Sequence, residues 1–240
     1  MRQARAICFD LDDTLLETGS LGRAIERVCG VLADETPGLD AARLLKANGE
    51  AWDAYWPEVE QSWTLGRLDT ASLGLEAWTR TLRACDCDDP GLATRARDLA
   101  WEHQWEDMRV FDDVTQVLDS LRRRYPLALI TNGASDLQRE KLRRLGIEPY
   151  FSAVLISGEA GCCKPDAAVF HLAAENLGVR PEDAWHIGDS PANDVVGAAE
   201  AGLTAVWLNR RGAGWPGLEP KPDYEVRSLD DLMSLLAETG

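Results

Sequence analysis

The sequence predicts an α/β protein with a doubly wound, mostly parallel sheet and a helical domain inserted after the first strand. Two observations predict this fold class. Short apolar runs alternate with amphipathic helical patterns, and a long Trp-rich stretch separates the first apolar run from the others. Strands that alternate with helices favour parallel pairing, because each parallel connection needs a crossover.

Five short runs are continuously apolar rather than alternating between apolar and polar residues. This pattern is typical of strands that are buried on both faces. The predicted strands are residues 6–9, 127–130, 153–156, 184–187 and 204–208. His186 lies within the fourth run, and we expect it to be a core histidine whose ring nitrogens are hydrogen-bonded.

Helical patterns fill most of the intervals between these runs. Residues 114–121 carry apolar side chains at the i, i+3, i+4, i+7 spacing of one helix face. We predict that Ser135 and Gln138 form a capping box at the start of the next helix, and that Gly146 ends that helix.

Three further helix starts are predicted from residues that favour the first turn. Pro165 suits the first position of one helix, Ser190 followed by Pro191 suits the start of another, and Ser228 suits the N-cap of the last.

The alternation is interrupted between the first run and about residue 111. Six of the nine tryptophans lie in this stretch, and their helical spacing favours a small core of their own. A segment this long is not a structureless loop in a compact domain. We predict a helical cap domain at residues 16–108, inserted into an α/β core made of residues 1–15 and 109–240.

The charge of the chain excludes several kinds of partner. With 25 basic and 41 acidic residues the net charge is −16, which disfavours binding to nucleic acid or to anionic membranes. No apolar run reaches the length of a membrane span, the N-terminus has no apolar signal region, and the cysteines lack zinc-ligand spacing. We expect a cytoplasmic protein that is a monomer or a homodimer.

Polar side chains follow the predicted strands at the points where ligands collect in open α/β sheets. They are Asp10, Asp12, Thr131, Asn132, Lys164, Asp189 and Asp194. Two like charges 4 Å apart repel by about 4 kcal/mol at an effective dielectric of 20. Converging carboxylates therefore need raised pKa values or a cation, and an all-oxygen ligand set suits Mg²⁺.

This set of residues predicts phosphoryl transfer. Asp10 is suited to attack phosphorus as a carboxylate nucleophile. Asp12, two residues on, is suited to protonate the leaving alkoxide and then to activate water. Thr131 and Asn132 are expected to donate hydrogen bonds to the phosphoryl oxygens, and Lys164 to stabilise their charge.

Two acids remain for the metal. Asp189 is the strongest candidate for a direct metal ligand. Asp194 is either a further ligand or a residue that orients one, and a third interpretation is that it supports the first turn of its helix.

The four motifs occur in the order found in the haloacid dehalogenase (HAD) superfamily, and the chain resembles its phosphatase branch with a helical (C1) cap. The motifs are Asp-Leu-Asp-Asp-Thr from Asp10, Thr-Asn-Gly from Thr131, Lys164-Pro165, and Gly-Asp from Gly188 through Asp194.

The resemblance implies a Rossmann-like core, an aspartyl-phosphate on Asp10, and Mg²⁺ held by Asp10, the main-chain carbonyl of Asp12, and Asp189. The dehalogenase branch lacks the second aspartate and the metal, so Asp12 points away from dehalogenation.

The predicted function is the Mg²⁺-dependent hydrolysis of a small phosphorylated metabolite, a phosphomonoester. One alternative is a phosphomutase resembling β-phosphoglucomutase, which shares the core but returns the phosphoryl group to another hydroxyl. Another is a non-catalytic protein that binds a phosphometabolite, which the presence of Asp10, Asp12 and Lys164 disfavours. The sequence does not select the substrate.

Overall fold

The computed structural model describes residues 3–239, which form two compact units by their internal contacts. One unit contains the residues up to Glu17 and those from Arg109 onward, and the other is Thr18–Met108. The chain therefore divides close to the predicted boundaries at residues 16 and 108. That the second unit acts as a cap stays a prediction.

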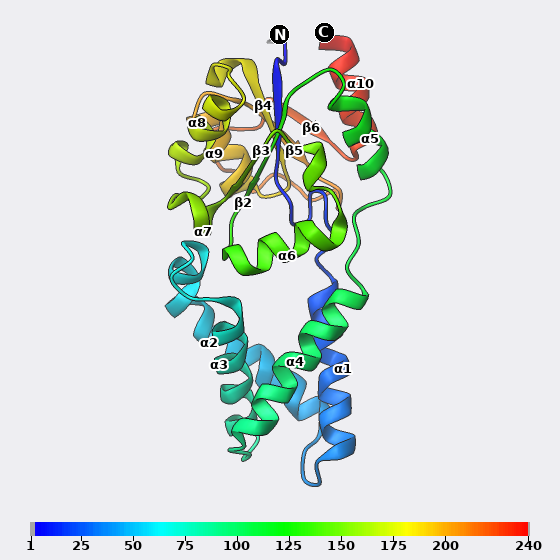
Figure 1. Ribbon diagram of the computed structural model, residues 1–240, viewed down its shortest axis with the longest axis vertical. Helices are drawn as coiled ribbons and strands as arrows, with labels where there is room; N and C mark the ends of the chain where they lie inside the picture. Colours follow the sequence, from blue (N-terminus) through cyan, green and yellow to red (C-terminus); the bar gives the residue numbers. More distant parts are fainter. Residues whose placement is uncertain (1–2, 240) are drawn as a thin grey trace. The chain divides into compact units, whose positions relative to one another are not determined.

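The first unit is built on a six-stranded parallel sheet in the order β3-β2-β1-β4-β5-β6 (Figure 1). The strands are β1 (Ala6–Phe9), β2 (Leu127–Thr131), β3 (Ala153–Ile156), β4 (Ala184–Gly188), β5 (Thr204–Leu208) and β6 (Tyr224–Val226). The five predicted strands are confirmed. The sixth was missed because it has three residues, one of them the charged Glu225.

The order of the strands determines where a ligand site forms. Strands β2 and β3 extend the sheet on one side of β1, and β4, β5 and β6 extend it on the other. Connections that leave a central strand in opposite directions open a crevice at the carboxyl ends of the strands. Here Asp10 follows β1, and Asp189 follows β4.

Helices cover both faces of this sheet, with α8 and α9 on one face and α5 and α10 on the other (Figure 1). The helices of the unit are α5 (Val114–Leu121), α6 (Ser135–Leu145), α7 (Ser157–Ala160), α8 (Ala167–Asn176), α9 (Gly197–Glu200) and α10 (Leu229–Thr239). Two 3₁₀ turns, η1 (Glu148–Tyr150) and η2 (Pro181–Asp183), and a π-helical segment, η3 (Pro191–Val196), complete it.

The core of the sheet is apolar on both sides because the strands carry no polar alternation. Cys8, Ala128 and Ile130 pack with Phe170 of α8 and Trp207 of β5 on one face, and each is at most 3% exposed. Full burial of a side chain such as Phe170 stabilises the fold by roughly 1.5–3 kcal/mol. The rigid sheet that results is the support on which the polar strand ends are held.

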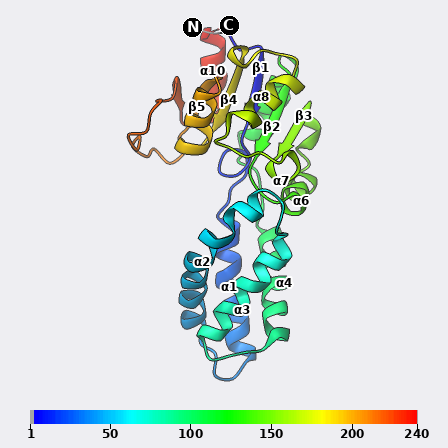
Figure 2. The ribbon, with the colours of Figure 1, turned by 90° about the vertical axis from the view of Figure 1, so that its left-hand side faces the viewer.

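The second unit consists of four helices, coloured blue to green in Figure 2. They are α1 (Ser20–Glu35), α2 (Ala41–Thr64), α3 (Thr70–Ala84) and α4 (Pro90–Glu106). Aspartates at residues 40, 69 and 89 cap the last three by accepting hydrogen bonds from main-chain N–H groups.

The tryptophans of this unit contribute to its own packing, as predicted for most of them. Trp78 is 4% exposed in a cluster with Leu32, Leu44 and Leu82. Trp56 and Trp63 of α2 lie 5.5 Å apart, ring centre to ring centre, in an edge-on contact.

Among residues 3–239, no helix combines the length and the apolar character that a membrane crossing requires.

Several predicted helix ends are confirmed. Gly146 adopts a left-handed conformation (φ 65°) at the C-cap of α6. Ser190 caps η3 by accepting a hydrogen bond from the Asn193 N–H at 3.3 Å, and Ser228 accepts one from the Asp231 N–H at 3.1 Å in the last helix.

One predicted capping box and one predicted helix start are wrong. The Ser135 hydroxyl donates to Glu159 instead of capping α6, and the Gln138 side chain turns toward the sheet edge, so no capping box forms. Helix α8 begins at Ala167 rather than at Pro165, because the Asp166 side chain accepts from the Ala168 N–H and acts as the N-cap.

Arg210, from the long loop between β5 and β6, holds the segment after β1 in place. Its guanidinium donates to the carbonyl of Thr14 at 3.1 Å and pairs with both oxygens of Asp113 at 2.9 Å. Asp113 also accepts from the Leu229 N–H. Burial opposes ionisation of Asp113, but the bonds from Arg210 and Leu229 outweigh it and hold its pKa below the usual value.

Candidate active site

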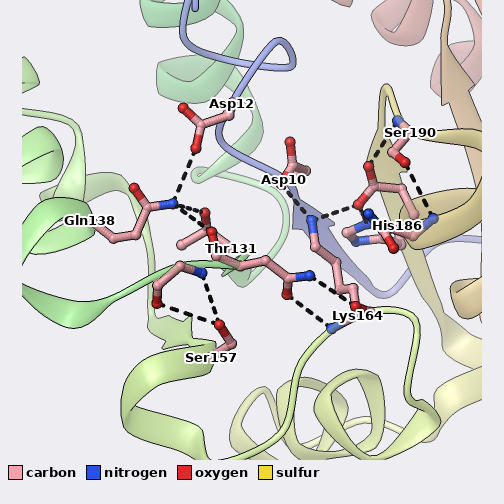
Figure 3. A network of polar contacts seen from close by, with 12 residues as sticks. Asp10, Asp12, Thr131, Gln138, Ser157, Lys164, His186 and Ser190 are labelled. Atoms are coloured by element: carbon pink, nitrogen blue, oxygen red, sulfur yellow. Dashed lines mark hydrogen bonds and ion pairs between the residues drawn. The ribbon is translucent and has the colours of Figure 1, made fainter. Parts of the chain in front are cut away.

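The seven site residues predicted from the sequence line one cavity at the carboxyl edge of the sheet. The cavity has a volume of about 160 Å³, and Ser190 and Asn193 also line it. Asp10 directly follows β1, and its position is fixed because its N–H continues the β1–β4 pairing by donating to the Ile187 carbonyl at 3.0 Å. Figure 3 shows the polar contacts around this cavity.

Lys164 lies at the centre of the charged part of the site. Its side-chain nitrogen Nζ is 2.5 Å from Asp10 Oδ1 and 2.6 Å from Asp194 Oδ1, and the residue is 4% exposed (Figure 3). Burial opposes a charge on Lys164, but Asp10 and Asp194 outweigh it and raise its pKa above the usual value. The buried lysine is therefore a permanent cation bridging two carboxylates.

Asp194 has both oxygens occupied by protein donors. Oδ1 accepts from Lys164 and from His186 Nε2 at 2.9 Å, and Oδ2 accepts from the Ser190 N–H at 3.0 Å. Burial opposes ionisation, but Lys164 and His186 hold the Asp194 pKa below its ordinary value. A side chain at Gly188 would collide with the Asp194 carboxylate, which explains the glycine at the end of β4.

His186 differs from the hydrogen-bonded core histidine expected from the sequence. Burial lowers its pKa, although Asp194 opposes this, so the ring is neutral near pH 7 and carries its proton on Nε2, facing Asp194. Nδ1 is buried without a hydrogen-bond partner within the described part of the chain. The ring stands edge-on to Phe170, with centres 5.0 Å apart.

The remaining carboxylates favour a cation. One oxygen each of Asp10, Asp189 and Asp194 lies within 4.8 Å of the others. Burial, with Asp194 and Asp189 nearby, raises the pKa of Asp10 to about 8 despite Lys164. Burial, with Asp194 and Asp13 nearby, raises that of Asp189 to about 7. Ionising all three acids beside one lysine would leave an excess of negative charge, which a hard divalent cation would neutralise.

The Thr131-Asn132 segment makes hydrogen bonds within the protein that the sequence did not predict. The Asn132 amide accepts from the Lys164 N–H at 2.9 Å and donates to the Lys164 carbonyl at 2.8 Å. Its side chain therefore fixes the main chain that carries Lys164. The Thr131 hydroxyl accepts from Gln138 Nε2 at 2.5 Å, which leaves its own hydrogen available to a group in the cavity.

Asp12 faces helix α6. Lys141 Nζ lies 2.7 and 2.9 Å from its two carboxylate oxygens, and Gln138 Nε2 donates to Oδ2 at 3.1 Å. Asp13, next in the chain, has a left-handed conformation (φ 58°) and pairs with Arg211 outside the cavity lining. The tight turn separates the two neighbouring acids, so only Asp12 lines the cavity.

Sequence reasoning missed Gln138, Lys141 and the role of His186. Gln138 and Lys141 are three residues apart, so they share one helix face, and both are buried although polar. Their spacing after Thr-Asn-Gly was the available signal, but the capping-box interpretation concealed it.

The arrangement is suited to chemistry on an anion. A buried carboxylate and a permanent cation line a small cavity, together with a hydroxyl whose hydrogen is available and a second, more exposed carboxylate. Such a site combines a nucleophile, a proton carrier and charge stabilisation.

Comparisons with known proteins agree with this geometry. The family model for haloacid dehalogenase-like hydrolases matches residues 4–202. The chain is 37% identical to the phosphoserine phosphatase of Thermus thermophilus, over 95% of this chain and 97% of that one. It is 30% identical to the mouse N-acylneuraminate-9-phosphatase, over 98% and 95%. It also resembles the crystal structure of a 2-haloacid dehalogenase from Pseudomonas syringae pv. tomato, with 28% identity, a TM-score of 0.71, and coverage of 99% and 100%.

Proposed function

The chain belongs to the haloacid dehalogenase-like hydrolase family, and on that premise we propose that it is a Mg²⁺-dependent phosphatase of small phosphomonoesters. The observation that carries the proposal is the buried Asp10 carboxylate, bonded to Lys164 and lining one cavity with Asp12 and Thr131. This is the constellation that nucleophilic attack on a phosphoryl group requires.

Asp10 is the proposed nucleophile. One of its oxygens attacks phosphorus, the bond from phosphorus to the ester oxygen breaks, and an aspartyl-phosphate forms. Lys164 donates a hydrogen bond to Asp10 Oδ1, so the other oxygen, Oδ2, is the one free to attack. Lys164 and the Thr131 hydroxyl stabilise the charge on the transferring phosphoryl group.

Asp12 is the proposed acid and base. In the first step it gives a proton to the departing alkoxide, and in the second it takes a proton from the water that attacks the aspartyl-phosphate. The second step releases phosphate and regenerates Asp10. Asp12 lies two residues from Asp10 and lines the same cavity, which supports a shared role at one phosphorus centre.

Asp10 and Asp189 are the proposed side-chain ligands of Mg²⁺, together with the main-chain carbonyl of Asp12. The raised pKa values of the two acids and the all-oxygen set of ligand atoms fit such an ion. Bound there, Mg²⁺ would neutralise phosphoryl charge. Asp194, whose oxygens already accept three hydrogen bonds, is better suited to holding Lys164 than to binding the ion.

The proposed substrate is a small phosphorylated metabolite, as the names of the phosphoserine and N-acylneuraminate-9 phosphatases suggest for those relatives. The helical unit is the proposed cap that selects the leaving group. We favour hydrolysis over dehalogenation because Asp12 supplies a proton carrier that an alkoxide needs.

Phosphate release tests this function directly. Purified protein is assayed with p-nitrophenyl phosphate and with a panel of phosphorylated metabolites that includes phosphoserine and a 9-phosphorylated sialic acid. Mg²⁺ and EDTA are compared, and halide release from 2-chloropropionate is followed in parallel. We expect phosphate release with Mg²⁺ and none with EDTA. Halide release alone would refute the proposal, and activity that requires a sugar bisphosphate would point to a mutase.

Mg²⁺ binding is expected to release protons at about pH 6.5 and progressively fewer as the pH rises past about 8. Asp10 and Asp189, with pKa values of about 8 and about 7 in the metal-free protein, must lose their protons to bind the ion. Calorimetry in two buffers of unequal ionisation enthalpy measures this: the two heats should differ at about pH 6.5 and agree at about pH 9.

The raised pKa values of Asp10 and Asp189 also determine how the stability of the metal-free protein changes with pH. An acid whose pKa is raised by folding favours the folded state at low pH, and this contribution is lost as pH rises through the folded value. Metal-free protein should therefore lose stability between about pH 4 and about pH 8, and Mg²⁺ should restore it at the upper end. A metal-free stability that rises across this range would contradict the assignment.

A further inference from the structure

Helix α6 delivers two polar side chains that the proposed mechanism does not use. Gln138 is fully buried and Lys141 is 6% exposed, and both contact the Asp12 carboxylate (Figure 3 labels Gln138 and Asp12). Polar residues this buried are uncommon, and each must be hydrogen-bonded to be tolerated. Their partner is the carboxylate proposed to carry the proton.

Lys141 fixes the orientation of this carboxylate. Its Nζ lies 2.7 Å from Oδ1 and 2.9 Å from Oδ2 of Asp12, so one ammonium group contacts both oxygens. The Asp12 side chain is 32% exposed, whereas that of Lys141 is 8% exposed. Lys141 is therefore the buried member of the pair, and from helix α6 it fixes the more exposed Asp12 carboxylate, which lines the cavity.

Gln138 connects Asp12 to the phosphate-binding segment. Its Nε2 lies within hydrogen-bond distance of Asp12 Oδ2 (3.1 Å), Thr131 Oγ1 (2.5 Å) and the Asn132 carbonyl (3.0 Å). The opposite amide orientation would place an oxygen against a carboxylate and a carbonyl, so these neighbours identify the nitrogen. Oε1 has no hydrogen-bond partner among residues 3–239.

We propose that Gln138 and Lys141 are positioning residues, which hold the Asp12 carboxylate beside Thr131 for proton transfer to the leaving group. The proposal rests on the function proposed above and extends it to helix α6. A carboxylate fixed by two buried donors serves an ester whose alcohol must be protonated on departure.

The test compares two substrates of nearly the same shape but different demand for acid catalysis. p-Nitrophenyl phosphate has a good leaving group, and phenyl phosphate has a poorer one. We measure kcat/KM for both, because this quantity reports formation of the phosphoenzyme when that step is irreversible. Lys141→Met and Gln138→Met should each lose about ten-fold more activity on phenyl phosphate than on p-nitrophenyl phosphate.

Two further variants are controls for the ratio of kcat/KM on p-nitrophenyl phosphate to kcat/KM on phenyl phosphate. Lys141→Arg keeps the charge and should restore a ratio near that of wild type, whereas Arg143→Met removes an exposed cation from the same helix and should leave it unchanged. If the two residues had only a structural role, their loss would lower kcat/KM equally for both substrates. Equal losses on the two substrates in Lys141→Met and Gln138→Met would therefore overturn the inference. If Lys141→Met does not fold, Gln138→Met decides by the same ratio.

The inference and the proposed function fail in different ways. A wild-type protein that releases no phosphate from any substrate refutes the function. An active wild type, in which Asp12→Asn shows the leaving-group effect but the α6 variants do not, refutes only the role of Gln138 and Lys141.

Discussion

Asp10→Asn is expected to reduce phosphate release by at least about 10⁴-fold in kcat, because an amide does not replace a carboxylate as nucleophile. The fold should persist, since asparagine has nearly the same shape and Lys164 keeps its bond to Asp194. Asp10 is also the carboxylate whose pKa burial raises to about 8, so its neutral replacement removes no favourable charge from the metal-free protein.

Two measurements separate this outcome from misfolding. Thermal unfolding with and without Mg²⁺ should show a wild-type-like metal-free midpoint and a loss of the stabilisation by Mg²⁺. Mass spectrometry of protein quenched during turnover should find one added phosphoryl group in wild type and none in the variant. Asp230→Asn, an exposed acid on α10, is the matched control. Full activity in Asp10→Asn would remove Asp10 from the mechanism.

The sheet and the position of the site were predictable because both depend on patterns within short segments. Strands buried on two faces must be continuously apolar, and polar residues at the ends of parallel strands must meet at one edge. For this reason the runs before Asp10, Thr131 and Asp189 located both the strands and the cavity. Strand β6 was not predicted, because a three-residue segment with a central Glu225 has no continuous apolar run.

The contacts within the site were less predictable, because they depend on which way a side chain turns. Gln138 occupies the third position after Ser135 and fits a capping box by spacing alone, yet its amide is drawn to the acceptors of Asp12 and Thr131. The phosphate contact of Asn132 stays a prediction, but the hydrogen bonds of its amide to two main-chain groups of Lys164 were not expected. Both partners are distant in sequence, so no local pattern records them.

Lys164→Met is expected to impair both stability and activity. Lys164 separates the carboxylates of Asp10 and Asp194, which both contact its Nζ. Without the ammonium group, the buried Asp194 carboxylate, whose pKa Lys164 helps to hold below its ordinary value, loses the cation that it contacts. Breaking a buried ion pair from one side costs about 3–5 kcal/mol, so the metal-free variant should lose that much unfolding free energy near neutral pH.

The catalytic loss has a separate origin. The variant keeps the proposed nucleophile but lacks the cation that stabilises the phosphoryl charge, so kcat should fall by about 10³-fold even with saturating Mg²⁺. Denaturant unfolding in EDTA and steady-state kinetics measure the two effects, with Lys46→Met, an exposed lysine on α2, as the control. Asp194→Asn in the Lys164→Met background removes the carboxylate that has lost its cation, so it should recover stability without recovering turnover. If the double variant regains neither stability nor activity, the unpaired Asp194 charge is not the cause of the instability. If it regains both, Lys164 only neutralises Asp194 and takes no part in phosphoryl transfer.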